Sequence, residues 1–125
     1  MKGTSDRAAE VAQNKLLSTL GLCARARGLV IGTPMVCEAL RIPEGKRGRV
    51  IAVLEAADTS ANTHDKLVSK CAYYGIPHYR VDVTTAELAH AIGKSAATAA
   101  VGVTHEGLWQ AMTKHIDAAA SPSAH

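Results

Sequence analysis

Aromatic side chains are almost missing from this chain of 125 residues. Phenylalanine does not occur, and aromatic residues make up 3% of the sequence although 47% of it is hydrophobic. The core must therefore consist of aliphatic and alanine side chains, which allow close contacts between helices and a sheet. A chain of this length can bury such a core within one domain, and we expect no second domain.

Cysteine is also scarce. Cys23, Cys37 and Cys71 form an odd set that is widely spaced among apolar residues. Together with the lack of a secretory signal, this pattern predicts free, buried thiols and a cytoplasmic protein. Neither a CxxC pair nor two histidines one helical turn apart occur, so we expect no metal site and no cofactor.

Long apolar runs and catalytic motifs are missing as well. No segment is apolar over the length that crosses a membrane, so we expect no membrane partner. Nothing matches a nucleophile elbow, a phosphate-cradling glycine loop or a metal triad. Acid and base side chains occur at Glu55, Asp58, His64 and Asp65, but a loop and the first turns of a helix explain the last three. We therefore expect a protein that is not an enzyme.

A regular alternation of helix and strand signals runs through the chain. The predicted strands span residues 29–31, 49–54, 78–81 and 98–103, and the predicted helices span 5–27, 33–40, 60–74, 84–92 and 105–117. This order predicts an α/β fold, a three-layer α/β/α sandwich with a four-stranded mixed sheet. We expect one domain over residues 1–117 and a disordered tail over residues 118–125.

The stretch from Gly28 to Leu40 organises the chain. Its short strand is followed by Gly32, by Thr33 as the predicted N-cap and by Pro34 at the first helical position. The first N–H groups of a helix have no partner within it, so such a helix start can hold a phosphate or a base edge. An ordinary strand-to-helix turn without a ligand explains the same residues. Evidence from the rest of the chain is needed to choose between a binding site and an ordinary turn.

The charge balance is mildly basic. The formal net charge is +3 and the isoelectric point is near 8.9, which is compatible with a nucleic-acid partner without requiring one. Arg25, Arg27, Lys46 and Arg47 are the candidate phosphate contacts outside the helix start. Complementation of a helix dipole and an ordinary solvated rim explain these four residues equally well.

Four segments, taken in order, carry a family resemblance. They are KLLSTLGLCARARGLVIGTPMVCEAL, VIAVLEAADTSANTHDKLVSKCAYYGIPHYRV, LAHAIGK and AVGVTHEGL. Their order and spacing over about residues 14–112 resemble the bacterial YlxQ-like branch of the ribosomal kink-turn RNA-binding superfamily. That superfamily includes the archaeal large-subunit protein seven-Ae, the eukaryotic thirty-e and twelve-e proteins and the Gadd stress proteins. The combination of NTxxKLxxKCxYYxIP with LxxxIGK is specific at the family level.

The resemblance implies an α/β/α sandwich that binds sharply kinked RNA without catalysis. Family members hold the RNA with the N-terminal turn of the second helix and with the loop before the last strand. In this sequence those parts fall on Gly32 and Thr33 and on Lys94, Ser95 and Ala96. Polar groups would read the bases of the kink while basic residues meet its closely spaced phosphates.

The helix start departs from the family's RNA-reading signature. That signature is glycine, any residue, asparagine, glutamate, two further residues and lysine, of which this chain keeps only Gly32. Pro34 has no amide group, Met35 has no carboxylate, and Glu38 brings a negative charge where lysine would attract phosphate. Each lost base contact removes about 1–3 kcal/mol of discrimination.

Two hypotheses follow from this balance of resemblance and departure. The first is a non-catalytic, ribosome-associated RNA-binding protein that recognises structured, kink-turn-like RNA, including ribosomal RNA. The alternative is a protein-interaction module that keeps the fold, has lost kink-turn recognition and binds ribosome or translation factors. The sequence has no coiled-coil pattern, which favours a monomer.

Overall fold

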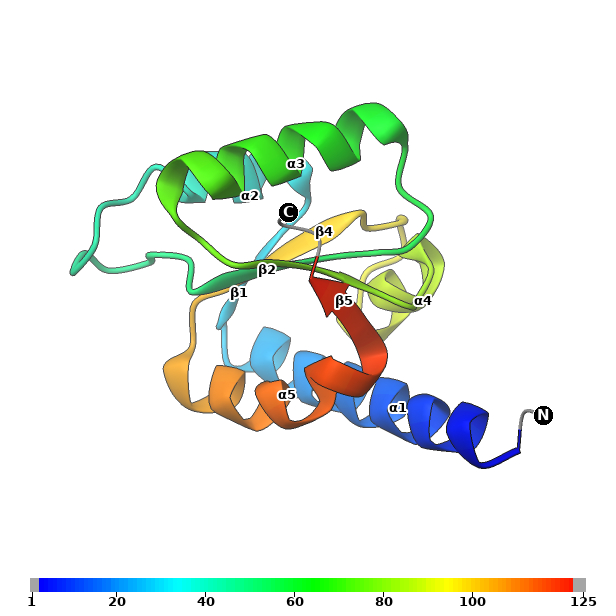
Figure 1. Ribbon diagram of the computed structural model, residues 1–125. Helices are drawn as coiled ribbons and strands as arrows, with labels where there is room; N and C mark the ends of the chain where they lie inside the picture. Colours follow the sequence, from blue (N-terminus) through cyan, green and yellow to red (C-terminus); the bar gives the residue numbers. More distant parts are fainter. Residues whose placement is uncertain (1–2, 123–125) are drawn as a thin grey trace.

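The computed structural model describes the backbone of residues 3–122 and the side chains of residues 10–116 (Figure 1). Helices and strands alternate along nearly the whole chain. The elements are α1 (Gly3–Arg25), β1 (Leu29–Ile31), α2 (Thr33–Ala39), β2 (Ala52–Glu55), α3 (Ala61–Tyr74), β3 (His78–Val81), α4 (Thr85–Ala91), β4 (Ala100–Val103), α5 (Glu106–Ala119) and β5 (Ala120–Pro122). Within these described residues, no helix is both long and apolar enough to span a membrane.

The elements form three layers. Helices α2 and α3 cover one face of the sheet, and α1 and α5 lie against the other face (Figure 1). The strand order is β1-β4-β2-β3-β5. Strands β2 and β3 are parallel, and every other pair is antiparallel. The predicted α/β/α sandwich with a mixed sheet of β1 to β4 is therefore confirmed, and β5 adds a fifth strand.

The C-terminal end differs from the prediction of a disordered tail from residue 118. Helix α5 continues to Ala119, and β5 pairs with β3 so that Val81 faces Ala120 and Tyr79 faces Pro122. Without β5, the backbone N–H and C=O groups on the outer side of β3 would lack strand partners, and this pairing satisfies them. Residues 123–125 of the predicted tail lie outside the described residues.

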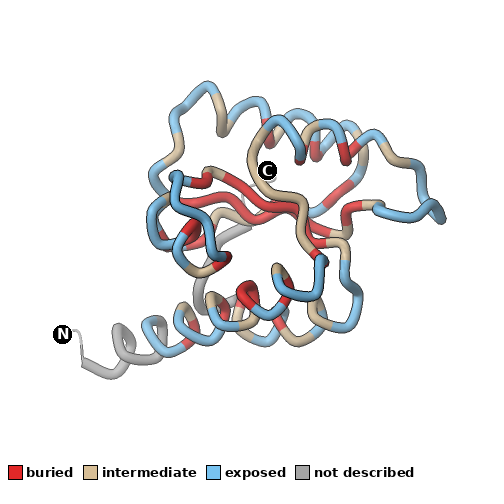
Figure 2. The backbone as a smooth tube through the Cα atoms, turned by 180° about the vertical axis from the view of Figure 1, so that it is seen from behind, coloured by how far each residue is buried: buried red, intermediate tan, exposed pale blue. Residues whose placement is uncertain are grey.

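The core consists of two apolar clusters, one on each face of the sheet. Leu54 belongs to the cluster under α1, α4 and α5, and its neighbour Val53 belongs to the cluster under α2 and α3. Successive side chains of a strand point to opposite faces, which explains this division. Figure 2 shows the buried residues gathered in the strands and on the inner faces of the helices. Both clusters are mainly aliphatic, as the scarcity of aromatic residues predicts.

Candidate nucleic-acid interface

The start of α2 and the loop before β4 meet at one end of the sheet. The backbone N–H of Gly32 donates a hydrogen bond of 2.9 Å to the carbonyl of Ala100 and so ties the end of β1 to the start of β4. A hollow of about 440 Å³ opens beside this contact. It is lined by residues 31–34 and 94–99. The two segments that the family resemblance singles out therefore form one surface feature.

The start of α2 has a different cap from the predicted one. Gly32, rather than Thr33, is the N-cap residue, with a φ of 93°, a backbone conformation that glycine adopts without strain. The Gly32 carbonyl accepts the first helical hydrogen bond, from Val36 at 2.9 Å. Thr33 begins the helix and makes no side-chain cap, while Pro34 in the first turn has no N–H to donate.

The opposite wall of the hollow is a loop held firmly at both ends. The Lys94 N–H donates to the Ala89 carbonyl at 2.9 Å, and the Thr98 N–H donates to the Thr85 carbonyl at 3.2 Å. Thr98 is buried, whereas residues 94–97 are exposed. Lys94, Ser95 and Ala96 therefore sit at a solvent-facing tip whose position is fixed by α4 and β4.

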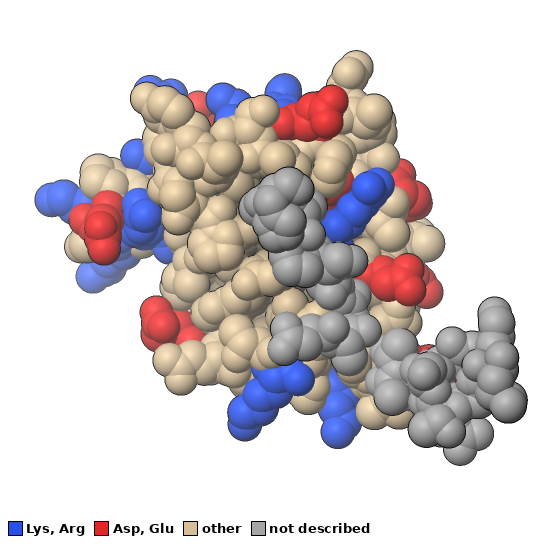
Figure 3. All heavy atoms as spheres, viewed as in Figure 1, with Lys and Arg blue, Asp and Glu red and all other residues tan. Residues whose placement is uncertain are grey.

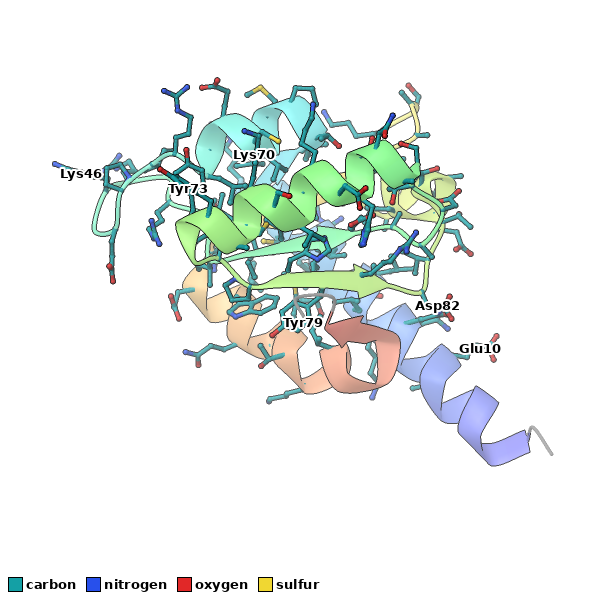
Figure 4. All side chains as sticks on the ribbon, turned by 45° about the horizontal axis from the view of Figure 1, so that its top comes forward. Glu10, Lys46, Lys70, Tyr73, Tyr79 and Asp82 are labelled. Atoms are coloured by element: carbon teal, nitrogen blue, oxygen red, sulfur yellow. The ribbon has the colours of Figure 1, made fainter. Side chains whose placement is uncertain are left out.

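Lys46 and Arg47 lie at the other end of the sheet. They line a second hollow together with residues 48–51, 75–77, Thr104 and Glu106, next to the entry of β2. Figure 4 shows Lys46 on a loop that projects away from the body of the protein, and basic side chains gather on this loop in Figure 3. The fold thus separates these two residues from the hollow at Gly32.

Arg25 and Arg27 also lie apart from the hollow at Gly32. Arg25 borders a third hollow, between α1 and α4, together with Gly21 and His90. Arg27 has a φ of 60° in the turn before β1, and β1 begins opposite Val103, at the end of the sheet away from Gly32. Of the nine predicted contact residues, the structure brings together only Gly32, Thr33, Lys94, Ser95 and Ala96.

A buried polar cluster lies beneath α3, and spacing along the sequence did not reveal it. Glu55 at the end of β2 is completely buried, and one of its carboxylate oxygens lies 2.8 Å from His64 Nδ1 and 2.7 Å from His78 Nε2. Thr59 donates a hydrogen bond to the other oxygen. The Nε of Arg80 lies 4.0 Å from the same oxygen. The cluster draws on β2, the loop that follows it, the first turn of α3, and β3.

These contacts keep Glu55 ionised. Burial alone raises the pKa of the carboxyl group, but the hydrogen bonds from His78, Thr59 and His64 outweigh it and lower the pKa to about 2. A carboxylate without such donors would be protonated in an apolar layer. Glu55 therefore carries a negative charge inside the protein at neutral pH.

Of the two remaining acidic candidates, Asp58 has a structural role and Asp65 lies on the surface. The Asp58 carboxylate accepts hydrogen bonds from the Thr85 N–H at 2.7 Å and from the Thr85 hydroxyl at 3.3 Å, so it supports the start of α4. Ser60 caps α3 by accepting from the Thr63 N–H. Asp65 is exposed on α3.

A family profile matches most of the chain. Residues 14–113 match the ribosomal protein L7Ae/L30e/S12e/Gadd45 family. The chain belongs to this family. The RNA-binding protein YlxQ of Bacillus subtilis is a further relative, 36% identical over 98 residues that cover 78% of this chain and 91% of that protein. The predicted family resemblance is confirmed.

Solved structures of two proteins share the L7Ae-family fold seen here. A protein of unknown function from Bacillus halodurans is 36% identical with a TM-score of 0.71, over 82% of this chain and 97% of that one. The 15.5kD RNA binding protein of Giardia lamblia has a TM-score of 0.63 over 83% of each chain. Its identity of 19% means that this second likeness concerns the fold alone.

Proposed function

We propose that this L7Ae-family protein binds structured, kink-turn-like RNA and performs no catalysis. The hollow between the start of α2 and the loop at Lys94 is the observation that carries the proposal. Its two walls are the two segments that family members place against kinked RNA. In addition, the relative of this chain in Bacillus subtilis is named as an RNA-binding protein. We further propose that the protein acts in the cytoplasm, as a monomer associated with the ribosome.

The chemistry of the hollow fits RNA that is held mainly through its backbone and by shape. Lys94 offers a positive charge for a phosphate, and the hydroxyl groups of Thr33 and Ser95 can donate to phosphate or ribose oxygens. Met35 is 60% exposed next to Pro34, so its thioether can cover the face of an unstacked base. Pro34 and Met35 stand where the family signature has asparagine and glutamate.

Glu38 is less of an obstacle to phosphate than the sequence alone indicates. Its carboxylate lies 3.6 Å from a guanidinium nitrogen of Arg41, one turn further along the chain, and both side chains are largely exposed. Such an exposed pair contributes at most about 1 kcal/mol to stability. The neighbouring positive charge nevertheless offsets the field of Glu38 at the surface that would face the RNA.

Titration against a kink-turn RNA and an unkinked duplex, at two salt concentrations, tests the proposal. We expect the wild type to prefer the kinked RNA, and Lys94→Ala to weaken that binding and lower the salt dependence by about one phosphate contact. Lys70→Ala is the matched control, because Lys70 is an exposed lysine on α3, outside the hollow. Equal weakening by the two variants would place the RNA elsewhere on the protein.

A second pair of variants tests whether the protein has kept or lost the recognition of kinked RNA. Met35→Glu and Glu38→Lys each restore one residue of the family signature. If the wild type ignores the kink while the restored variants prefer it, the native partner is something other than kinked RNA, and the search turns to proteins of the translation machinery. The exposed Met35 beside Pro34 would then be the first surface to test for that contact.

A further inference from the structure

The buried cluster of Glu55, His64 and His78 is not used by the proposed RNA interface. None of the three residues lines the hollow between α2 and the loop at Lys94. Their side chains converge from β2, α3 and β3, and one nitrogen or oxygen atom from each lies within 4.8 Å of the other two. Two imidazole nitrogens and a carboxylate oxygen are the donor set of many zinc sites with three protein ligands.

We propose that Glu55, His64 and His78 bind a divalent transition metal ion of the zinc class. The ligand atoms are His64 Nδ1, His78 Nε2 and one carboxylate oxygen of Glu55. Such a site ties the end of β2 to the first turn of α3 and to the first residue of β3. The proposal is independent of RNA binding, and neither depends on the success of the other.

The three ligand atoms have to shift before they can surround an ion. Zinc bonds of about 2.0–2.2 Å in a tetrahedral site place neighbouring ligand atoms about 3.4 Å apart. The contacts of Glu55 with His64 and His78 are 2.8 and 2.7 Å, so they widen by roughly 0.6 and 0.7 Å to admit the ion. The two histidine nitrogens, which lie within 4.8 Å of each other, adjust to the same spacing of about 3.4 Å. His64 is able to make this adjustment, because it lies in the first turn of α3 and its side chain is 24% exposed.

Because His64 is partly exposed, an ion can enter the cluster from solvent, and a water molecule can serve as its fourth ligand. The side chains of Glu55 and His78 are 0% and 1% exposed, so solvent reaches the cluster beside His64. Water can then complete a four-coordinate site in which the protein supplies three ligands. Thr59 donates to the carboxylate from a neighbouring position and holds it in place, as outer contacts of metal ligands usually do.

The charges in the cluster favour a cation. The Glu55 carboxylate is completely buried between the two imidazole rings. The buried Nε of Arg80 lies 4.0 Å from the carboxylate and has no hydrogen-bond partner within the described part of the chain. A divalent ion between the three donors compensates the carboxylate directly.

A hydrogen-bonded cluster without metal is the competing interpretation, and the two differ in where protons reside. Without metal, His64 Nδ1 and His78 Nε2 carry protons and donate them to Glu55. With metal, both atoms present lone pairs to the ion, and any proton on a neutral ring sits on the other nitrogen. Imidazole nitrogen NMR shifts therefore report directly on the proposal.

Zinc titration of the full chain, freed of metal by a chelator and carrying no histidine tag, is the test. We expect one zinc ion per chain, a higher melting temperature with zinc, and nitrogen shifts confined to the rings of His64 and His78. Cobalt in place of zinc should give the visible absorption of a four-coordinate site. Absence of saturable binding at one ion per chain would overturn the proposal.

Variants assign the binding to this cluster. His64→Gln keeps a polar side chain at a half-buried position and should weaken zinc binding by about 100-fold. His90→Gln is the matched control, since His90 is exposed on α4, and it should bind zinc as the wild type does. Equal affinity in His64→Gln, Glu55→Gln and the wild type would show that zinc binds elsewhere. Circular dichroism confirms that each variant is folded, and His64→Gln alone suffices if Glu55→Gln unfolds.

Discussion

Acid should destabilise this protein through Glu55, even in a buffer with chelator. The pKa of the carboxyl group is about 2 in the folded protein, against an ordinary value of 4.5. As the pH falls, Glu55 therefore takes up a proton in the unfolded chain before it does so in the folded protein, and the free energy of unfolding decreases. The stabilisation is complete above pH 4.5 and disappears as the pH falls through 2.

The two pKa values set the size of this effect. Their difference corresponds to about 3 kcal/mol of stability at neutral pH, of which about 2 kcal/mol is lost by pH 3. The side chain of Glu55 is fully buried, so solvent does not screen the contribution. This contribution is large compared with the total free energy of unfolding of a typical protein, about 5–15 kcal/mol.

Urea unfolding at pH 7, 5 and 3 measures the contribution. Glu55→Gln keeps the size of the side chain and removes the ionisation, so we expect lower stability at pH 7 and a smaller loss on acidification than in the wild type. Glu10→Gln is the control, because Glu10 is exposed on α1 (Figure 4), and it should lose stability with acid as the wild type does. Parallel losses in the wild type and Glu55→Gln between pH 5 and pH 3 would refute the reasoning.

Two further predictions concern buried positions. Burial raises the pKa of the Cys23 thiol to about 11 and that of Cys71 to about 12, so a thiol reagent at pH 8 should label only the half-buried Cys37 until the protein unfolds. A native thiol count above one contradicts this. Gly28→Ala should cost about 1–3 kcal/mol in urea unfolding, because the new Cβ would lie 2.6 Å from a neighbouring atom. Gly107→Ala, with its nearest contact at 3.4 Å, should cost less.

Local signals were enough to predict most of the fold. The predicted strands at 29–31 and 78–81 have the observed bounds, because turn residues frame each of these short segments. Thr84 followed three residues later by Glu87 is the sequence signature of a capping box, and both of its hydrogen bonds are present at the start of α4. Strand β5 escaped prediction because its stability comes from pairing with β3 rather than from its own composition.

The candidate sites depend on contacts that are distant in the sequence. Glu55 is 9 residues from His64 and 23 from His78. The parallel register that pairs Val53 with His78 brings His78 beside Glu55, and the start of α3 brings His64 over them. The positions of Lys46 and Arg47 likewise depend on strand direction, which composition does not specify. Family resemblance, by contrast, singled out the two segments that line the hollow, because it is carried by the order and spacing of motifs along the whole chain.

The strand order also determines when the hollow can form. Strand β1 joins the sheet through β4, and the hydrogen bond that positions Gly32 ends on Ala100. When only the first 90 residues have been synthesised, β1 therefore lacks its neighbour β4, and one wall of the hollow is missing. The hollow, and with it the RNA recognition proposed for this surface, requires that β4 has been synthesised and has paired with β1.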